Sequence, residues 1–212
     1  MTKRRRKPGV FFLLAGSILI TLSLLLTFRN LHTEQQADDA ITKVSTSVLP
    51  AIQAKEETDD DETQVTSDPE LLAGREMPTV TVDGHTYIGE IYVPTYDMTL
   101  PVMSSWSYDN LEVSPCRFAG NIYDGSLVIA GHNYRKHFSP LRWLPMGSEI
   151  DFIDAEGNTW RYELSYVDIL QPDEVDKLTA VSDKYDLTLF TCTIGGQSRY
   201  TMRLKRIEDT KE

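Results

Sequence analysis

The feature that most constrains this chain is an uncharged segment near its N-terminus. Residues 8–28 read PGVFFLLAGSILITLSLLLTF and follow the basic tail MTKRRRK of residues 1–7. As a helix, these 21 residues would extend ~31 Å, which is about the thickness of the hydrocarbon core of a bilayer. The segment is longer than the apolar part of a secretory signal peptide, and no A-x-A-like cleavage site follows it. The sequence therefore favours an uncleaved transmembrane anchor.

The charges that flank this segment predict its orientation. Five Lys or Arg residues precede it, and only Arg29 follows it closely. Positively charged flanks are retained on the cytoplasmic side of a membrane. The N-terminus is therefore predicted to be cytoplasmic, with everything after Arg29 outside the cell membrane.

An acidic stretch, residues 29–75, separates the apolar segment from the rest of the chain. Between residues 30 and 70 there are 11 acidic residues against Lys43 and Lys55. Dense like charge without apolar periodicity is typical of a solvated, extended linker. One part of it, interrupted by Pro50, has apolar residues at helical spacing and could form a short amphipathic helix. These residues are Ile41, Val44, Val48 and Ile52.

Residues 76–208 have the pattern of a mainly β domain, and residues 209–212 form a short tail. Alternating runs such as TVTV, DLTLFTCT and RYTMRLKRI are separated by turn residues such as Asp83-Gly84. Helical signals are few and short. Several short strands at this spacing predict a closed or nearly closed β-barrel with short helical connections. A domain of this length can bury one modest core.

The charge and the cysteines of this domain limit the classes of function that it can have. It has 19 acidic residues against 11 Lys or Arg and lacks a basic patch with interleaved aromatic residues, so we expect no binding to nucleic acid. Two cysteines, Cys116 and Cys192, would lie outside the membrane, where a disulfide is permitted. The competing interpretation is a reactive thiol at Cys192 and a buried, inert thiol at Cys116.

Three residues at strand ends could combine into a cysteine-dependent active site. Cys192 follows LTLF and His132 follows SLVIAG, so each side chain would be held by a rigid strand. Arg199 follows the turn Gly195-Gly196, which could return it beside Cys192. A nucleophilic thiol needs a proton partner and donors for the oxyanion it creates, which a histidine and an arginine supply. No metal site is expected, because His132 and His137 lack the further ligands that zinc requires.

The segments around these residues resemble the sortases, membrane-anchored cysteine transpeptidases of Gram-positive cell surfaces. The resemblance rests on LVIAGHNY, on FSPLRWLPMGSEIDF after it, and on DLTLFTC followed by Arg199. The family signature is a strand ending in T-L-x-T-C, an arginine several residues downstream and a histidine well upstream. The matching positions in this chain are Cys192, Arg199 and His132.

The resemblance implies a β-barrel of about eight strands in which Cys192 attacks a Thr–Gly-type bond. That bond would lie in an LPXTG-like sorting motif near the C-terminus of a secreted protein. The thioacyl enzyme would be resolved by an amine of a peptidoglycan precursor or by a pilin lysine. His132 would protonate the leaving amine and deprotonate the incoming one. Arg199 would hold the carbonyl or the oxyanion, with a weaker contribution from the backbone near Thr191.

The stretch between Leu170 and Asp186 bears on subclass and on cofactors. It is too short for the long helix that class B sortases carry there, which disfavours class B. Its acids Asp173, Glu174 and Asp176 resemble the calcium site of some class A members, although acids at a helix start are more often partners of the helix dipole. We therefore expect no cofactor, with calcium as the alternative.

Other functions fit the sequence less well. An L,D-transpeptidase pattern has glycine before the cysteine and arginine two residues after it, whereas Thr191 and Ile194 stand at those positions. Papain-like and NlpC-type cysteine peptidases have the cysteine before the histidine, which is the reverse of this order. A tethered β-barrel that only binds cell-surface ligands is the remaining alternative, and in that case Cys192→Ala would leave function intact.

Overall fold

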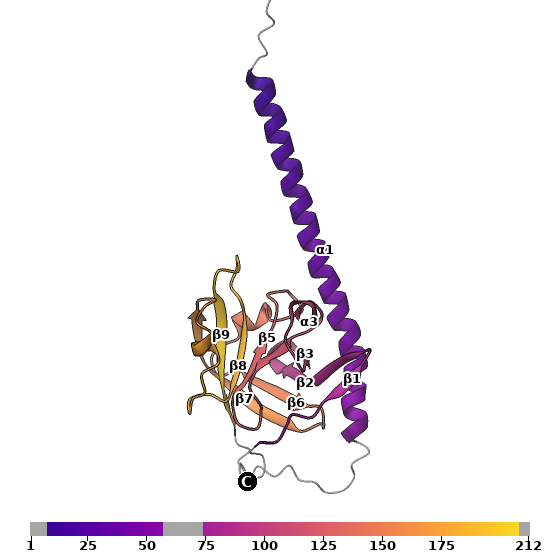
Figure 1. Cartoon of the computed structure of the whole chain (residues 1–212), viewed down its shortest axis with the longest axis vertical. Helices are drawn as coiled ribbons and strands as arrows, with labels where there is room; N and C mark the ends of the chain where they lie inside the picture. The colour runs from indigo at the N-terminus through magenta and orange to yellow at the C-terminus, as the bar shows by residue number, and fades with distance from the viewer. Residues whose placement is uncertain (1–7, 57–73, 208–212) are drawn as a thin grey trace, which may run out of the picture. The chain divides into compact units, whose positions relative to one another are not determined.

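The computed structural model describes residues 8–56 and 74–207 (Figure 1). It divides into two compact units, residues 1–36 and residues 37–212. The first unit consists, in its described part, of the N-terminal portion of helix α1 (Pro8–Glu56). Within it, Gly9–Arg29 is long and apolar enough to cross a membrane, by length and composition alone.

The second unit begins with the remainder of α1, where the predicted linker proves to be partly helical. The helix continues through Pro50 to Glu56, so Pro50 does not interrupt it. Ile41, Val48 and Ile52 are buried, as their helical spacing predicted. An interior proline costs ~3 kcal/mol, and burial of three aliphatic side chains is enough to offset that cost. Residues 57–73 of the linker lie outside the described residues.

The rest of the second unit is a β-barrel with short helices. Its sheet has the order β1-β2-β3-β4-β5-β8-β9-β7-β6, and an additional pairing of β2 with β6 closes strands β2 to β9 into a ring. The predicted barrel of about eight strands is therefore confirmed, and β1 is an extra strand on β2. The elements are β1 (Val80–Val82), β2 (His85–Val93), η1 (Pro94–Tyr96), β3 (Met98–Met103), α3 (Tyr108–Val113), β4 (Cys116–Ala119), β5 (Leu127–Ala130), η2 (Pro140–Trp143), β6 (Glu149–Asp154), β7 (Thr159–Leu170), α4 (Val175–Leu178), β8 (Leu187–Cys192) and β9 (Arg199–Arg206).

The predicted β1–β2 hairpin turns at Asp83-Gly84. Both residues have positive φ, 51° and 82°, which is the conformation of a two-residue turn whose twist matches that of the strands. Val82 and His85 pair directly on either side. The Asp-Gly turn therefore sets the register in which β1 pairs with β2.

Alternation along the strands separates the inside of the barrel from a second buried layer outside it. On β8, Leu187 and Leu189 belong to the interior cluster, whereas Phe190 belongs to a cluster on the outer face. Successive side chains of a strand point to opposite faces, so Cys192 lies on the same outer face as Phe190. We call the second set the outer cluster; it comprises Val48, Ile52, Tyr87, Met103, Leu111, Cys116, Val128, Ala130, Leu170, Leu178 and Phe190.

A buried carboxyl group lies on β2, between β3 and β6. Glu90 pairs with Pro101 on one side and with Ile153 on the other. Its side chain is buried, and its Oε2 atom has no hydrogen-bond partner among the described residues. Burial raises the pKa of Glu90 from 4.5 to about 7, because desolvation penalises the charged form.

We expect Glu90→Gln to stabilise the fold at about pH 8 and to change little at about pH 4. Because folding raises the pKa of Glu90, its protonated carboxyl group contributes fully to stability below pH 4.5. This contribution is lost as the pH rises through about 7. Removing the ionisation should therefore raise the free energy of unfolding at alkaline pH by about 2 to 3 kcal/mol. Urea unfolding at the two pH values measures this, and equal effects at both would contradict it.

Candidate active site

Cys192 ends β8 on the outer face of the barrel. Its side chain is partly exposed, and the cysteine is free. Phe190, two residues earlier, is buried in the outer cluster and packs edge-to-face against Phe118 at 5.3 Å between ring centroids. The thiol is therefore held at the rim of an apolar surface, where it remains open to a reaction partner.

A tight hairpin returns the chain from Cys192 to Arg199, as the sequence predicted. Strands β8 and β9 lie side by side (Figure 1), and the two residues are direct partners in their register. Gly195 and Gly196 have φ of 88° and 72°, a region that side chains disfavour, and Gly196 N donates to Thr193 O at 2.8 Å. Arg199 Nη1 lies 3.4 Å from Cys192 Sγ and 3.5 Å from Gly196 O. A guanidinium group is thus placed directly beside the thiol.

His132 reaches the same end of the sheet from β5. Strand β5 is parallel to β8, and Ala130 pairs with Phe190. His132 and Cys192 each stand two residues beyond that pair, and Gly131 N donates to Phe190 O at 3.0 Å. The two side chains therefore leave neighbouring strands at the same level and on the same face.

The residues after His132 form a compact support for its ring. The imidazole stacks on the ring of Tyr134, with centroids 4.5 Å apart and planes 25° apart. Phe138 N donates to His132 O at 3.0 Å, and the Phe138 ring packs so closely on Gly131 that a Cβ there would lie 2.4 Å from it. Glycine before the histidine is thus a packing requirement. Tyr134 and Phe138 lie in the segments LVIAGHNY and FSPLRWLPMGSEIDF, but the sequence pattern does not mark either as a support of the histidine.

Burial lowers the pKa of His132 below its ordinary value of 6.5, and the nearby Glu112 carboxylate opposes that shift. At pH 7 the ring is therefore mainly neutral. We expect an NMR titration of the His132 imidazole resonance to have a midpoint below pH 6.5. The resonance is assigned by its absence from the spectrum of the His132→Gln variant. A midpoint above this value would show that Glu112 outweighs burial.

Thr191 is not brought together with these three side chains. It alternates with Cys192 on β8, is buried, and stands opposite Tyr200. Tyr200 packs against the interior cluster, so the Thr191 side chain lies on the inner face of the strand. Only its backbone is left for the predicted contribution to an oxyanion site.

Cys116 differs from Cys192 in its exposure to solvent. It is fully buried on β4, its Sγ donates to Ser114 O at 3.2 Å, and it forms no disulfide. Burial raises the pKa of its thiol to about 12. Because the thiolate is the reactive form, Cys116 is an inert thiol, and the disulfide alternative is not what the structure shows.

The acids proposed as a calcium site do not form one among the described residues. Both carboxylate oxygens of Glu174 are engaged, Oε1 with Lys177 Nζ at 2.6 Å and Oε2 with Gln171 N at 2.8 Å. In residues 8–56 and 74–207, no group of three or more His, Cys, Asp or Glu is arranged to hold a metal ion. Glu174 is the residue at the N-terminal boundary of α4, and its side chain makes no capping hydrogen bond to the helix.

Comparison with known proteins agrees with this geometry. The Sortase domain family model matches residues 91–206, a span that contains His132, Cys192 and Arg199. The chain is 28% identical to Sortase A of Bacillus anthracis over 182 residues, which is 82% of this chain and 83% of that protein. Sortase C1 of Streptococcus agalactiae has the same fold, with a TM-score of 0.56 at 19% identity over 81% of this chain and 99% of that one. A Clostridium perfringens sortase D5 transpeptidase is similar at a TM-score of 0.51, 24% identity and 57% and 79% coverage. Since the family model spans more than half of its length, the chain belongs to the sortase family and is a transpeptidase of the sortase type.

Proposed function

We propose that this protein is a membrane-anchored cysteine transpeptidase that cleaves an LPXTG-like sorting motif through a thioacyl intermediate on Cys192. The observation that carries the proposal is the Arg199 guanidinium, 3.4 Å from Cys192 Sγ. Donors at this position can stabilise the oxyanion that develops when Sγ attacks a carbonyl carbon. Because a peptide bond is cleaved, the chemistry is also of the hydrolase type when water is the acceptor.

In the first half-reaction, Cys192 Sγ forms a bond to the carbonyl carbon of the threonine in the motif. The lowered pKa of His132 keeps its ring neutral near pH 7, so it can accept the thiol proton. His132 then transfers that proton to the nitrogen of the following glycine as the C–N bond breaks. The peptide amine departs, and a thioester remains on Cys192.

In the second half-reaction, an amine attacks the thioester. His132 takes a proton from the amine as the new amide bond forms, and returns a proton to the departing Cys192 sulfur. The amine would come from a peptidoglycan cross-bridge precursor or from a lysine of a pilin subunit. Arg199 would serve both half-reactions, because each passes through an oxyanion on the same carbonyl oxygen.

Residues 8–28 would hold the enzyme in the cell membrane with the N-terminus in the cytoplasm. The apolar length of Gly9–Arg29 and the basic residues before it support this orientation. The catalytic domain would then lie outside, where secreted proteins that carry a C-terminal sorting motif arrive.

The test is intact-mass spectrometry of the full-length protein in detergent, incubated with a panel of LPXTG-like peptides. A mass increase equal to the N-terminal fragment of one peptide, discharged by an added amine, is expected. Protein whose exposed thiol has first been alkylated with iodoacetamide is the control and should form no adduct. An adduct that still forms on the alkylated protein would count against this mechanism. If no peptide forms an adduct while the thiol remains reactive, the result would count against this motif.

A further inference from the structure

A buried arginine lies four residues beyond Arg199 on β9. Arg203 is only 2% exposed, and its guanidinium reaches out of the strand to the connection between β7 and β8. Nη1 donates to Leu178 O at 3.0 Å, and Nη2 donates to Lys177 O at 2.7 Å. These carbonyls belong to the last turn of α4, where a helix leaves its carbonyl groups without internal partners. Arg203 therefore caps the C-terminal end of α4.

The same guanidinium is fixed in place from the sheet. Nη1 also donates to Thr188 Oγ1 on β8 at 2.9 Å, and Nε donates to Asp168 Oδ2 on β7 at 3.3 Å. The ring of Tyr185 packs against it, 4.5 Å from the guanidinium carbon to the ring centroid. A charged group that is buried and bonded on all sides is costly to assemble. It is one of the few buried charged residues of the domain, and the proposed reaction does not use it.

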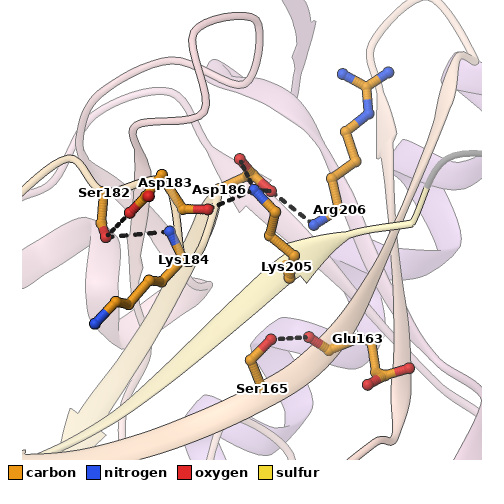
Figure 2. Close-up of polar contacts among 8 residues, drawn as sticks. All are labelled: Glu163, Ser165, Ser182, Asp183, Lys184, Asp186, Lys205 and Arg206. Atoms are coloured by element: carbon orange, nitrogen blue, oxygen red, sulfur yellow. Dashed lines mark hydrogen bonds and ion pairs between the residues drawn. The ribbon is translucent and has the colours of Figure 1, made fainter.

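The far end of the same connection is tied to β9 as well. Figure 2 shows Asp186 between Lys205 and the backbone of Arg206. Lys205 Nζ also donates to Asp183 O at 3.0 Å, and Tyr185 Oη donates to Ala180 O at 2.8 Å. The connection between β7 and β8 is thus attached to the barrel at both its middle and its end.

This connection adjoins the face that carries Cys192. Leu178, whose carbonyl Arg203 holds, is buried in the outer cluster with Leu170 and Phe190. Leu170 stands opposite Arg199 in the β7–β9 register, and Phe190 is two residues before Cys192. A shift of α4 would therefore displace Leu178 from the surface next to the thiol.

We infer that Arg203 is a positioning residue that fixes the β7–β8 connection as one preformed wall of the substrate groove. The inference rests on the proposed function, because it gives the connection a role in holding the sorting peptide. Preformed walls bind a peptide without the entropic cost of ordering a loop. Loosening the wall should thus weaken peptide binding while leaving the chemistry at Cys192 intact.

The experiment compares full-length Arg203→Lys with the matched control Arg206→Lys in detergent. Arg206 is on the same strand and also packs on an aromatic ring, 4.2 Å from the Trp160 centroid, but its side chain holds no carbonyl of α4. Arg203→Lys should raise KM for the sorting peptide about 5- to 20-fold and leave kcat within about twofold, since charge-assisted bonds to the loop are lost but no reacting group is. The rate of Cys192 alkylation by iodoacetamide should not change. Amides of residues 171–186 should exchange with solvent faster than in the control.

Each result bears on the inference. Equal KM for Arg203→Lys and Arg206→Lys would overturn it and leave the proposed function standing. A parallel loss of kcat and of thiol reactivity would also overturn it, because that is the result of general destabilisation. If Arg203→Lys does not fold, Thr188→Val removes one of the hydrogen bonds that hold the Arg203 guanidinium in place, and an unchanged KM there would overturn the inference. If the wild-type protein accepts no peptide at all, the proposed function fails and the inference fails with it.

Discussion

Replacing Cys192 with alanine is expected to abolish the peptide adduct and to lower transpeptidation at least about a thousandfold, because no other group can carry the acyl intermediate. The fold should tolerate the change. The side chain is partly exposed at a strand end, so the free energy of unfolding should move by no more than about 0.5 kcal/mol. Intact-mass spectrometry with the reactive peptide and urea unfolding measure the two effects separately.

Cys116→Ala is the matched control, since it removes the other thiol of the chain. Cys116 is fully buried in the outer cluster, so the free energy of unfolding should fall by about 1 to 2 kcal/mol. Adduct formation should continue at temperatures where the variant is folded. A folded Cys116→Ala protein that forms no adduct, or a Cys192→Ala protein that still forms one, would contradict the assignment of the nucleophile.

The sequence was sufficient to predict the barrel and the meeting of Cys192 with Arg199. Both follow from local rules: alternating side chains make strands, and a Gly-Gly pair between two strands makes a hairpin whose flanking residues stand opposite each other. The placement of His132 required one further step, that two apolar strands ending in functional residues are neighbours. The parallel pairing of β5 with β8 supplies that step, and it is read from the structure.

Other features depend on contacts that no local pattern reveals. The acidic stretch after the apolar segment predicted an extended linker with a short helix interrupted at Pro50, whereas α1 runs through Pro50 to Glu56 because its apolar side is buried. Glu174 had the residue type of a calcium ligand, yet its carboxylate is used by Gln171 and Lys177. Arg203 had the pattern of an exposed strand residue. Its burial arises from the fold of the β7–β8 connection above it, which is a tertiary property.

The second large effect is expected at Arg199. Arg199→Ala should lower kcat for adduct formation about 100- to 1000-fold, which is the range for removing one donor from an oxyanion site. Arg199→Lys should recover little of this loss, because an ammonium group cannot reproduce the planar guanidinium, whose Nη1 lies near both Cys192 Sγ and Gly196 O. Rapid-quench kinetics with the reactive peptide give the adduct rate directly.

Alkylation by iodoacetamide distinguishes a role of Arg199 at the oxyanion from a role in the reactivity of the Cys192 thiol. That reaction forms no tetrahedral oxyanion, so Arg199→Ala should retain an alkylation rate within about tenfold of wild type while peptide acylation falls much further. Arg206→Ala, which removes an arginine from the other end of β9, should leave both rates unchanged. If the two rates fell equally in Arg199→Ala, the guanidinium would act on the nucleophile itself, and the oxyanion would have to be stabilised by other donors, with the backbone near Thr191 the first to test.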